Sequence, residues 1–213
     1  MMLQLRKAHW PVTTLGFGRR VGIWLQGCSI GCPGCCSRDM WSSIGGATMS
    51  VSDLVSWCGK CAGDQLDGIT ISGGEPFEQA EGLLELVSEL GSLRQQAARE
   101  VDLLCYSGMP WRRLQKDHPA ILDLLDVIVP EPFVTTLDSA SLRGSINQPL
   151  IALSDLGRRR YPAGKSMPIK RLQIEVNEQN IWIIGIPEKG DLERIEQHCQ
   201  ANGLDLGQVS WRS

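Results

Sequence analysis

The sequence predicts an α/β fold, an open and partial β/α barrel built on a mainly parallel sheet. Short runs of β-branched and apolar residues alternate along the chain with longer stretches in which apolar residues recur at helical spacing. This alternation is typical of right-handed βαβ units, whose strands lie parallel in one sheet. About five or six such strands can be recognised, which is too few for a closed eight-stranded barrel.

The expected elements follow in chain order. Residues 1–20 are interpreted as an N-terminal arm with a short strand at 2–5. Strands are expected at 21–26, 68–72, 102–106 and 127–129, and helices at 50–61, 78–90, 119–125 and 191–202. Ser50 or Ser52 is the expected N-cap of the first helix. Residues 130–150 are expected to be mostly loop, and strands 172–176 and 181–185 to form a hairpin that turns at 177–180.

Length and composition predict one domain. The chain has 213 residues, of which 42% are hydrophobic and 21% charged, so it can form one core. We expect a single domain over 1–213, with the arm at 1–20, the core at 21–188 and a C-terminal helix and tail at 189–213. The net charge of −3 predicts no general attraction to nucleic acid or to an anionic membrane. With no signal peptide or membrane-spanning run in view, the eight cysteines predict a reducing, cytoplasmic location.

A cysteine-rich loop directly after the strand expected at 21–26 is the main candidate site. Cys28, Cys32 and Cys35 follow the spacing C-x3-C-x2-C, among glycines and a proline. A cubic [4Fe–4S] cluster normally takes four cysteine ligands, so three thiolates would leave one iron open to a substrate or cofactor. The loop would also lie at the carboxyl edge of the sheet, where the active sites of α/β folds gather. The spacing therefore predicts a reactive cluster.

Other uses of these thiols stay open at this level. A structural zinc site needs four ligands, and Cys36 would be the fourth, although it directly follows Cys35. A redox-active thiol is a further alternative, whereas a disulfide is disfavoured without a secretory signal. Cys58 and Cys61 form a separate C-x2-C pair, which we interpret as structural because it lacks two further ligands.

A second motif, Gly73-Gly74-Glu75-Pro76, comes straight after the buried strand expected at 68–72. Two glycines let the backbone approach a ligand closely, and their carbonyl groups can accept hydrogen bonds from an ammonium group. The Glu75 carboxylate would add a charge-assisted hydrogen bond to the same group. At about 40 residues after a three-cysteine loop, the motif is much more specific than an ordinary β–α turn.

Together, these motifs resemble the radical S-adenosylmethionine superfamily. The resemblance covers about residues 15–188 and is greater to the activating enzymes of glycyl-radical proteins, above all those of the anaerobic ribonucleotide reductases. The further stretches that carry it are Tyr106-Ser107-Gly108, Asp126-Val127-Ile128-Val129 leading to Pro132-Phe133, Arg143-Gly144-Ser145 and Asn147-Gln148. Where relatives often have Asp-Gly before Pro-Phe, this chain has Pro130-Glu131.

The resemblance implies a radical S-adenosylmethionine fold, which is a partial TIM-like barrel, and two cofactors, a [4Fe–4S] cluster and S-adenosylmethionine. It implies reductive cleavage of S-adenosylmethionine to a 5′-deoxyadenosyl radical, which abstracts hydrogen from a glycine of a partner glycyl-radical enzyme. An electron donor such as flavodoxin or ferredoxin would reduce the cluster.

The resemblance also implies residue roles. Cys28, Cys32 and Cys35 would be the cluster ligands. The residues that would bind S-adenosylmethionine are Gly34, Gly73, Gly74, Glu75, Pro76, Ser107, Gly185 and Ile186. Apart from the resemblance, Trp41 and Trp111 are expected on loops, where they would line the cofactor mouth or a partner surface, and Arg143 and Asn147 would either anchor their loop or touch the substrate.

Two rival functions remain open. The first is a radical enzyme that acts on a small molecule or a modified peptide, with the same cofactor-binding half. The second is a non-catalytic iron–sulfur protein that serves electron transfer or a complex scaffold, which would not need Gly73-Gly74-Glu75. Binding of S-adenosylmethionine separates this second rival from both enzymes.

Overall fold

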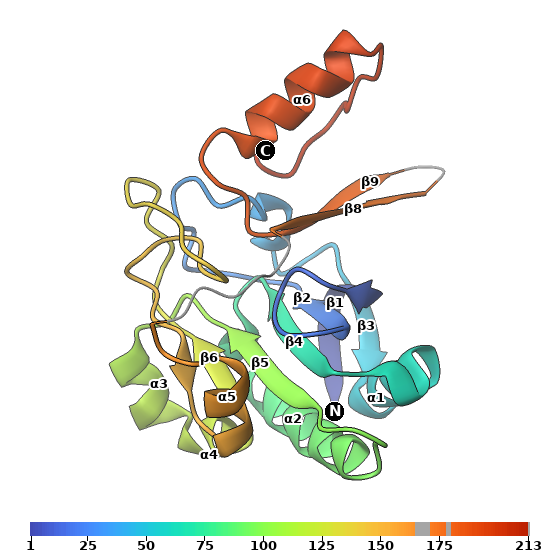
Figure 1. Cartoon of the computed structure of the whole chain (residues 1–213), viewed down its shortest axis with the longest axis vertical. Helices are drawn as coiled ribbons and strands as arrows, with labels where there is room; N and C mark the ends of the chain where they lie inside the picture. The colour runs from blue at the N-terminus through green and yellow to red at the C-terminus, as the bar shows by residue number, and fades with distance from the viewer. Residues whose placement is uncertain (165–170, 178–179, 213) are drawn as a thin grey trace.

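The computed structural model describes residues 1–164, 171–177 and 180–212, and its centre is one mixed sheet (Figure 1). In this part of the chain the sheet has seven strands in the order β3-β1-β2-β4-β5-β6-β7. Their bounds are β1 Met2–Val12, β2 Arg20–Leu25, β3 Ala47–Ser50, β4 Gly68–Gly73, β5 Asp102–Tyr106, β6 Val127–Val129 and β7 Ile151–Ala152.

The four central strands, β2, β4, β5 and β6, run parallel, as βαβ connections predict. β1 pairs antiparallel with β2, β3 with β1, and β7 with β6, so the antiparallel pairings lie at the two sides. Because β3 and β7 end the sheet without meeting, it is an open, partial barrel. The predicted fold class is therefore confirmed.

The described part of the chain has six α-helices, of which the first four pack on the face of the sheet that carries the main core. Their bounds are α1 Val51–Ala62, α2 Ala80–Gln95, α3 Trp111–Asp117, α4 Pro119–Leu122, α5 Asp155–Arg160 and α6 Asp191–Ala201, with single 3₁₀ turns at Arg38–Met40, Gly63–Gln65 and Pro76–Gln79. Leu54 of α1 and Leu83 and Leu86 of α2 are buried against Ile69 and Ile71 of β4. Ser50 is the N-cap of α1, since the Asp53 N–H donates to its Oγ over 3.0 Å.

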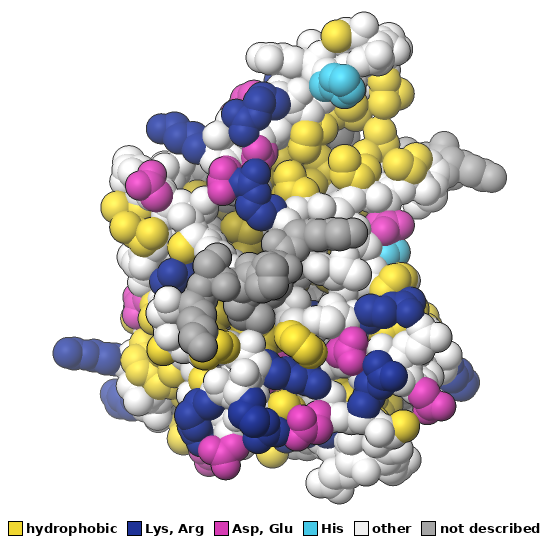
Figure 2. Space-filling model, in the orientation of Figure 1, with side chains coloured by type: hydrophobic (Ala, Val, Ile, Leu, Met, Phe, Trp, Pro, Cys, Tyr) yellow, Lys and Arg dark blue, Asp and Glu magenta, His cyan; other side chains and the backbone are white. Residues whose placement is uncertain are grey.

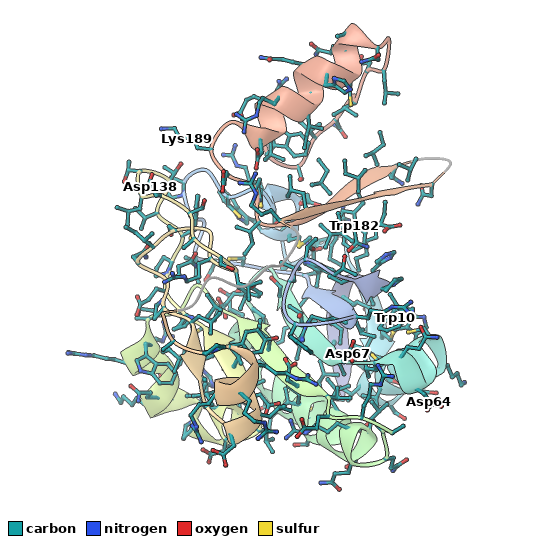
Figure 3. The ribbon with its side chains drawn as sticks, viewed as in Figure 1. Trp10, Asp64, Asp67, Asp138, Trp182 and Lys189 are labelled. Atoms are coloured by element: carbon teal, nitrogen blue, oxygen red, sulfur yellow. The ribbon has the colours of Figure 1, made fainter. Side chains whose placement is uncertain are left out.

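A hairpin, β8 Leu172–Val176 and β9 Ile181–Gly185, forms a separate two-stranded sheet on the side away from α1 and α2 (Figure 1). Its inner face rests on the main sheet through Trp182, whose ring meets that of Trp24 edge-on at 4.7 Å between centroids (Figure 3). Its other face is apolar and gathers with α6 into the patch seen in Figure 2; Ile174 and Val176 are exposed there. The predicted turn is closed by bonds between Asn177 and Asn180, whereas residues 178 and 179 lie outside the described residues.

The prediction of an N-terminal arm is wrong, because residues 2–12 form β1, an 11-residue strand between β3 and β2. Leu3 and Leu5 point into the main core, but the register with β2 shifts between Leu5 and Lys7. Ala8 and Trp10 then reach the same core. This bulge moves the apolar residues from odd to even positions, so a search for strict alternation ends the strand at Leu5.

The other differences concern short elements. β3, β7, α3 and α5 have 4, 2, 7 and 6 residues and were not predicted, since such lengths carry little periodicity. The helix expected at 119–125 ends at Leu122, and the one expected at 78–90 continues to Gln95. In the part of the chain that is described, no helix is both long and apolar enough to cross a membrane. That the whole chain is one domain remains our proposal.

Candidate functional site

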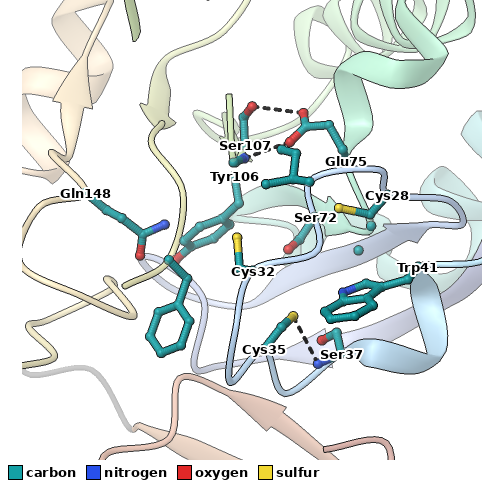
Figure 4. A pocket seen from close by; sticks show the side chains of 15 residues that line it. Cys28, Cys32, Cys35, Ser37, Trp41, Ser72, Glu75, Tyr106, Ser107 and Gln148 are labelled. Carbon is teal, nitrogen blue, oxygen red and sulfur yellow. Dashed lines mark hydrogen bonds between the residues drawn. The ribbon is translucent and has the colours of Figure 1, made fainter. Parts of the chain in front are cut away.

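The loops that follow β2, β4 and β5 meet at the carboxyl edge of the sheet and enclose a pocket (Figure 4). The first loop contributes Cys28, Cys32 and Cys35, the second Gly73 to Glu75, and the third Ser107 and Gly108. The three predicted ligands are thus brought together with four of the eight predicted cofactor contacts, Gly73, Gly74, Glu75 and Ser107, as parallel strands require of their carboxyl ends.

The backbone of the cysteine loop is held by segments on both sides. The N–H of Gly27 donates to Met40 O over 2.9 Å and that of Cys28 to Trp41 O over 3.0 Å. Ser29 donates from its N–H and its hydroxyl to Glu78 Oε1, over 2.8 and 2.6 Å. These bonds position the loop through its backbone and Ser29, so they leave the thiol groups of the proposed ligands available.

Backbone N–H groups near the cysteine sulfurs favour their charged form. Ser37 N–H donates to Cys35 Sγ over 3.4 Å. Burial raises the pKa of the Cys28 thiol, and the backbone N–H groups of Gly31 and Ile30 oppose this shift. Burial likewise raises the pKa of Cys32, opposed by the N–H of Phe133. Such donors stabilise thiolate charge and the charge of a bound cluster.

The donor set fits a cluster better than a single ion. Among the described residues, no three His, Cys, Asp or Glu side chains gather closely enough to hold one metal ion together. Three cysteines around one pocket suit a cube in which each binds a different iron, because those sulfurs lie further apart than the ligands of one ion. Cys36 does not line the pocket, and burial raises the pKa of its thiol to about 11. The four-thiolate zinc alternative is therefore disfavoured.

Positions 73 and 74 require glycine because the backbone there lies in close contact with the backbone of residues 25–27. Gly73 has φ of 115°, and a Cβ there would lie 2.3 Å from the backbone N and O of Leu25. A Cβ on Gly74 would lie 2.0 Å from Gly27 O. The N–H of Gly74 donates to Leu25 O and that of Glu75 to Gly27 O, each over 2.8 Å. What this backbone offers a ligand is therefore carbonyl oxygen, the acceptor that an ammonium group needs.

The Glu75 carboxylate is 1% exposed and bonds within the protein. Its Oε1 accepts hydrogen bonds from the Ser107 hydroxyl at 2.8 Å and Phe77 N–H at 3.1 Å, and its Oε2 accepts one from Gly108 N–H at 2.7 Å (Figure 4). Burial raises the pKa of Glu75, although these donors oppose the shift. Ser107 Oγ also accepts from Met109 N–H over 3.0 Å. Glu75 and Ser107 thus tie the second loop to the third, and a direct bond from either to the cofactor stays a prediction.

Pro76 begins the 3₁₀ turn after the glycines and is buried. Gly34, at φ of 77°, lies within the cysteine loop, where a Cβ would come 2.8 Å from Thr135 Oγ1. Gly185 and Ile186 do not line this pocket. A Cβ on Gly185 would lie 2.0 Å from Arg171 O, so this glycine serves the end of the hairpin. Contact between these last two residues and the cofactor is still only predicted.

Sequence reasoning missed several pocket residues, and Phe133 and Gln148 are the two that lie furthest along the chain from the cysteine loop. Their only signal was membership of the stretches that carry the resemblance, and the arrangement of that long loop cannot be obtained from spacing. Trp41 lines the pocket as expected. Cys58 is fully buried in the core, and burial raises its pKa to about 12, which agrees with a structural thiol.

Comparison with known proteins agrees with this geometry. Residues 14–151 match the family described as a 4Fe-4S single cluster domain. The anaerobic ribonucleoside-triphosphate reductase-activating protein of Haemophilus influenzae is 28% identical over 152 residues, which cover 66% of this chain and 92% of that protein. The corresponding activating protein of Escherichia coli K12 is 29% identical, over 66% of this chain and 93% of that protein. The one of phage T4 is 26% identical, over 66% of this chain and 88% of that protein.

Among solved structures, QueE from Escherichia coli superposes with a TM-score of 0.41 and 19% identity over 51% of this chain and 53% of that one. The family match spans the cysteine loop, the Gly-Gly-Glu turn and the strands that carry them. The chain therefore belongs to the 4Fe-4S single cluster domain family, and it is a radical S-adenosylmethionine enzyme with one [4Fe–4S] cluster and S-adenosylmethionine as its cofactors.

Proposed function

We propose that this enzyme abstracts a hydrogen atom from a glycine of a partner protein and so activates a glycyl-radical enzyme. The observation that carries the proposal is the open pocket at the carboxyl edge, where three cysteine sulfurs face the Gly73-Gly74 backbone. When bound there, the cluster and S-adenosylmethionine supply the 5′-deoxyadenosyl radical that removes the hydrogen atom. The protein supplies binding, orientation and exclusion of water.

Each group in the pocket has a role in the proposal. Cys28, Cys32 and Cys35 ligate the cluster, with the Gly34 backbone beside them. The carbonyl groups of Gly73 and Gly74 accept hydrogen bonds from the cofactor's amino group. Glu75, Pro76 and Ser107 set the position of that backbone.

Charge supports a cationic cofactor in this pocket. Within the described part of the chain, the buried Glu75 carboxylate bonds to N–H and O–H groups and to no cation. A buried carboxylate of this kind is costly, and a nearby positive charge offsets the cost. S-adenosylmethionine carries a sulfonium and an ammonium group, so its binding next to Glu75 would compensate the carboxylate.

Two observations favour a polypeptide as the hydrogen donor. The curated relatives are activating proteins of a reductase, so by their names they act on another protein. The loop that contributes Phe133 and Gln148 to the pocket also exposes Val134, Leu137 and Ile146. Exposed apolar side chains next to a site favour the binding of a peptide segment over that of a small polar molecule. A flavodoxin or ferredoxin is the electron donor that we expect.

The test follows the abstracted atom. The chain is reconstituted anaerobically with iron and sulfide, reduced, and mixed with S-adenosylmethionine and an anaerobic ribonucleotide reductase that carries deuterated glycine. We expect deuterium in the 5′-deoxyadenosine and a glycyl-radical signal on the reductase in electron paramagnetic resonance (EPR). Unlabelled 5′-deoxyadenosine without a reductase radical would instead favour a different substrate. A loaded cluster that never cleaves S-adenosylmethionine would contradict the enzyme itself.

A further inference from the structure

The pocket at the carboxyl edge has an excess of negative charge. Apart from the cysteines, Glu75 is the one ionisable side chain with an ordinary charge among the described residues that line it. Next to the pocket, the Glu78 carboxylate accepts the N–H of Ser29 in the cysteine loop over 2.8 Å. A cluster held by three thiolates is itself an anion, and its reduction adds one electron. Before S-adenosylmethionine binds, compensating positive charge has to come from the protein.

Arg38 approaches the pocket from the side of the cysteine loop. Its guanidinium carbon lies 5.2 Å from the ring centre of Trp41, and Trp41 lines the pocket. Arg38 Nε is closed off from water and has no hydrogen-bond partner in the described part of the chain. The neighbouring Asp39 does not pair with it, because the Asp39 carboxylate forms its ion pair with Arg6. Within the described residues, Arg38 therefore has no carboxylate partner.

Arg143 approaches the pocket from the other side. Its guanidinium donates to Gln148 O over 3.4 Å, and Gln148 lines the pocket. Gln148 and Trp41 lie on opposite sides of Cys32 (Figure 4). Like Arg38, Arg143 is half-buried and forms no ion pair with any residue that the structure describes. Two cations without acidic partners thus contact the walls of the pocket from two sides.

Both arginines lie on loops whose backbone is held by other groups. On the first loop, Met40 is buried and its carbonyl oxygen accepts the Gly27 N–H over 2.9 Å. On the second loop, Ser145 is completely buried and its Oγ accepts the Val134 N–H over 3.1 Å. A neutral side chain at either arginine position should therefore leave the loops in place.

We propose that Arg38 and Arg143 compensate the negative charge of the cluster and thereby raise its reduction potential. The proposal rests on the proposed ligation of the cluster by Cys28, Cys32 and Cys35. Reduction makes the cluster more negative, so a nearby positive charge stabilises the reduced form more than the oxidised form. Half-buried charges are screened by salt less than exposed ones are. Loss of either charge therefore lowers the potential, and the cluster is harder to reduce.

Two sets of variants of the reconstituted full chain test the proposal. Arg38→Gln, Arg143→Gln and the double variant remove charge, whereas Arg38→Lys and Arg143→Lys keep the charge and lose the planar guanidinium. Arg113→Gln is the control, since Arg113 is an exposed residue of α3 that pairs with Asp117. The readouts are iron and sulfide content, thermal stability, calorimetric titration with S-adenosylmethionine, and a redox titration with small-molecule mediators followed by EPR.

We expect every variant to load a full cluster. At the wild-type midpoint potential, the ratio of reduced to oxidised cluster should fall on the order of tenfold in each glutamine variant, and further in the double variant. The two lysine variants and Arg113→Gln should stay close to the wild type. Added salt should narrow the difference between wild type and glutamine variants, because both arginines are only half-buried.

An unchanged potential in the fully loaded double variant would overturn the proposal. So would a normal potential with weaker binding of S-adenosylmethionine, which would assign the arginines to the carboxylate of the cofactor. If one glutamine variant does not assemble a full cluster, the other decides by the same criterion. The redox titration uses neither cofactor turnover nor a partner protein, so its failure is distinct from a failure of the proposed glycyl-radical activation.

Discussion

Buried polar groups at the two ends of the central strands differ in whether they are paired within the protein. At the amino end, the Arg20 guanidinium begins β2, is fully buried, and donates to Thr70 Oγ1 at 2.6 Å and to Asp102 Oδ2 at 2.8 Å. Tyr161 donates to Asp102 over 3.0 Å, and Arg160 forms a second ion pair with it. At the carboxyl end, the cysteine sulfurs line an open pocket, and Glu75 has no cationic partner among the residues that the structure describes.

The pKa values of the two buried carboxylates, Asp102 and Glu75, shift in opposite directions. Burial alone would raise the pKa of Asp102, but the charges and hydrogen bonds of Arg20 and Arg160 outweigh burial and lower it. At Glu75 burial prevails and the pKa is raised. At the amino end, the protein's own arginines thus neutralise the buried carboxylate of Asp102. At the carboxyl end, where α/β folds place their active sites, the charge of Glu75 is left for a ligand to compensate.

Replacing a proposed cluster ligand should have the largest effect on function. Cys28→Ala, Cys32→Ala and Cys35→Ala each remove one corner of the cluster, so we expect no 5′-deoxyadenosine from any of them. Urea unfolding of the unloaded chain should change by less than about 1 kcal/mol, because partly exposed positions contribute little to stability. Cys58→Ala is the matched control and should keep most of the activity. An equally inactive Cys58→Ala would show that the second cysteine pair serves the cluster.

Breaking the amino-end network should have the largest effect on stability. Asp102→Asn leaves the Arg20 guanidinium buried without its counter-charge, which costs about 3–5 kcal/mol in the free energy of unfolding. Arg159→Ala, which removes the exposed pair with Glu100, should cost at most about 1 kcal/mol. Urea denaturation measures both. Similar small losses in the two variants would mean that the buried network contributes no more than a surface pair.

Part of the Asp102 contribution should depend on pH. The folded pKa lies below the usual 3.8, so the stabilisation is complete above that value and is lost as the pH falls through the folded pKa. The stability difference between wild type and Asp102→Asn should therefore shrink only in acid. At Glu75 the sign reverses: folding favours the protonated carboxyl below 4.5, and this contribution is lost as the pH rises through the raised pKa. Urea midpoints between about pH 3 and about pH 7 check both directions.

Replacing Gly74 or Gly91 by alanine should have the smallest effects, and the comparison tests only the space around each glycine. Gly74→Ala places a Cβ 2.0 Å from Gly27 O, so the backbone must move, at a cost of about 1–3 kcal/mol and with weaker binding of S-adenosylmethionine. Gly91→Ala, within α2, meets nothing within 4 Å and should stabilise by about 0.5–1 kcal/mol. Thermal unfolding and calorimetric titration measure the two effects. Normal cofactor binding by Gly74→Ala would argue against the proposed role of this backbone.

Much of the carboxyl end was predictable. The cysteine spacing and the Gly-Gly-Glu turn are local signals, and both follow strands whose β-branched runs predict them correctly. Parallel pairing then brings the ends together without further information. The roles of Glu75 and Ser107 were less predictable, because their mutual hydrogen bond joins residues 32 positions apart.

The amino end was not predictable in the same way. Arg160 is expected in no helix or strand, and Tyr161 belongs to no motif. Both side chains nevertheless bond to Asp102, about 60 positions earlier in the sequence. No periodic pattern of hydrophobic residues extends over such a separation. The place of β1 was hidden by a bulge that reverses its alternation. The stretch from Arg143 to Gln148 was visible as a motif, but its hydrogen bonds to residues 131, 132 and 134 were not.

By itself, the sequence determined the chemistry of this protein: three thiols at cluster spacing, a glycine turn after a strand, and the alternation that makes an open α/β barrel. Only the tertiary structure decided which residues touch the pocket, which carboxylate is neutralised, and which loop supports the cysteines. The physical reason is range. Ligand spacing and strand propensity depend on neighbouring residues, whereas burial, ion pairing and long-range hydrogen bonds depend on groups that only folding brings together.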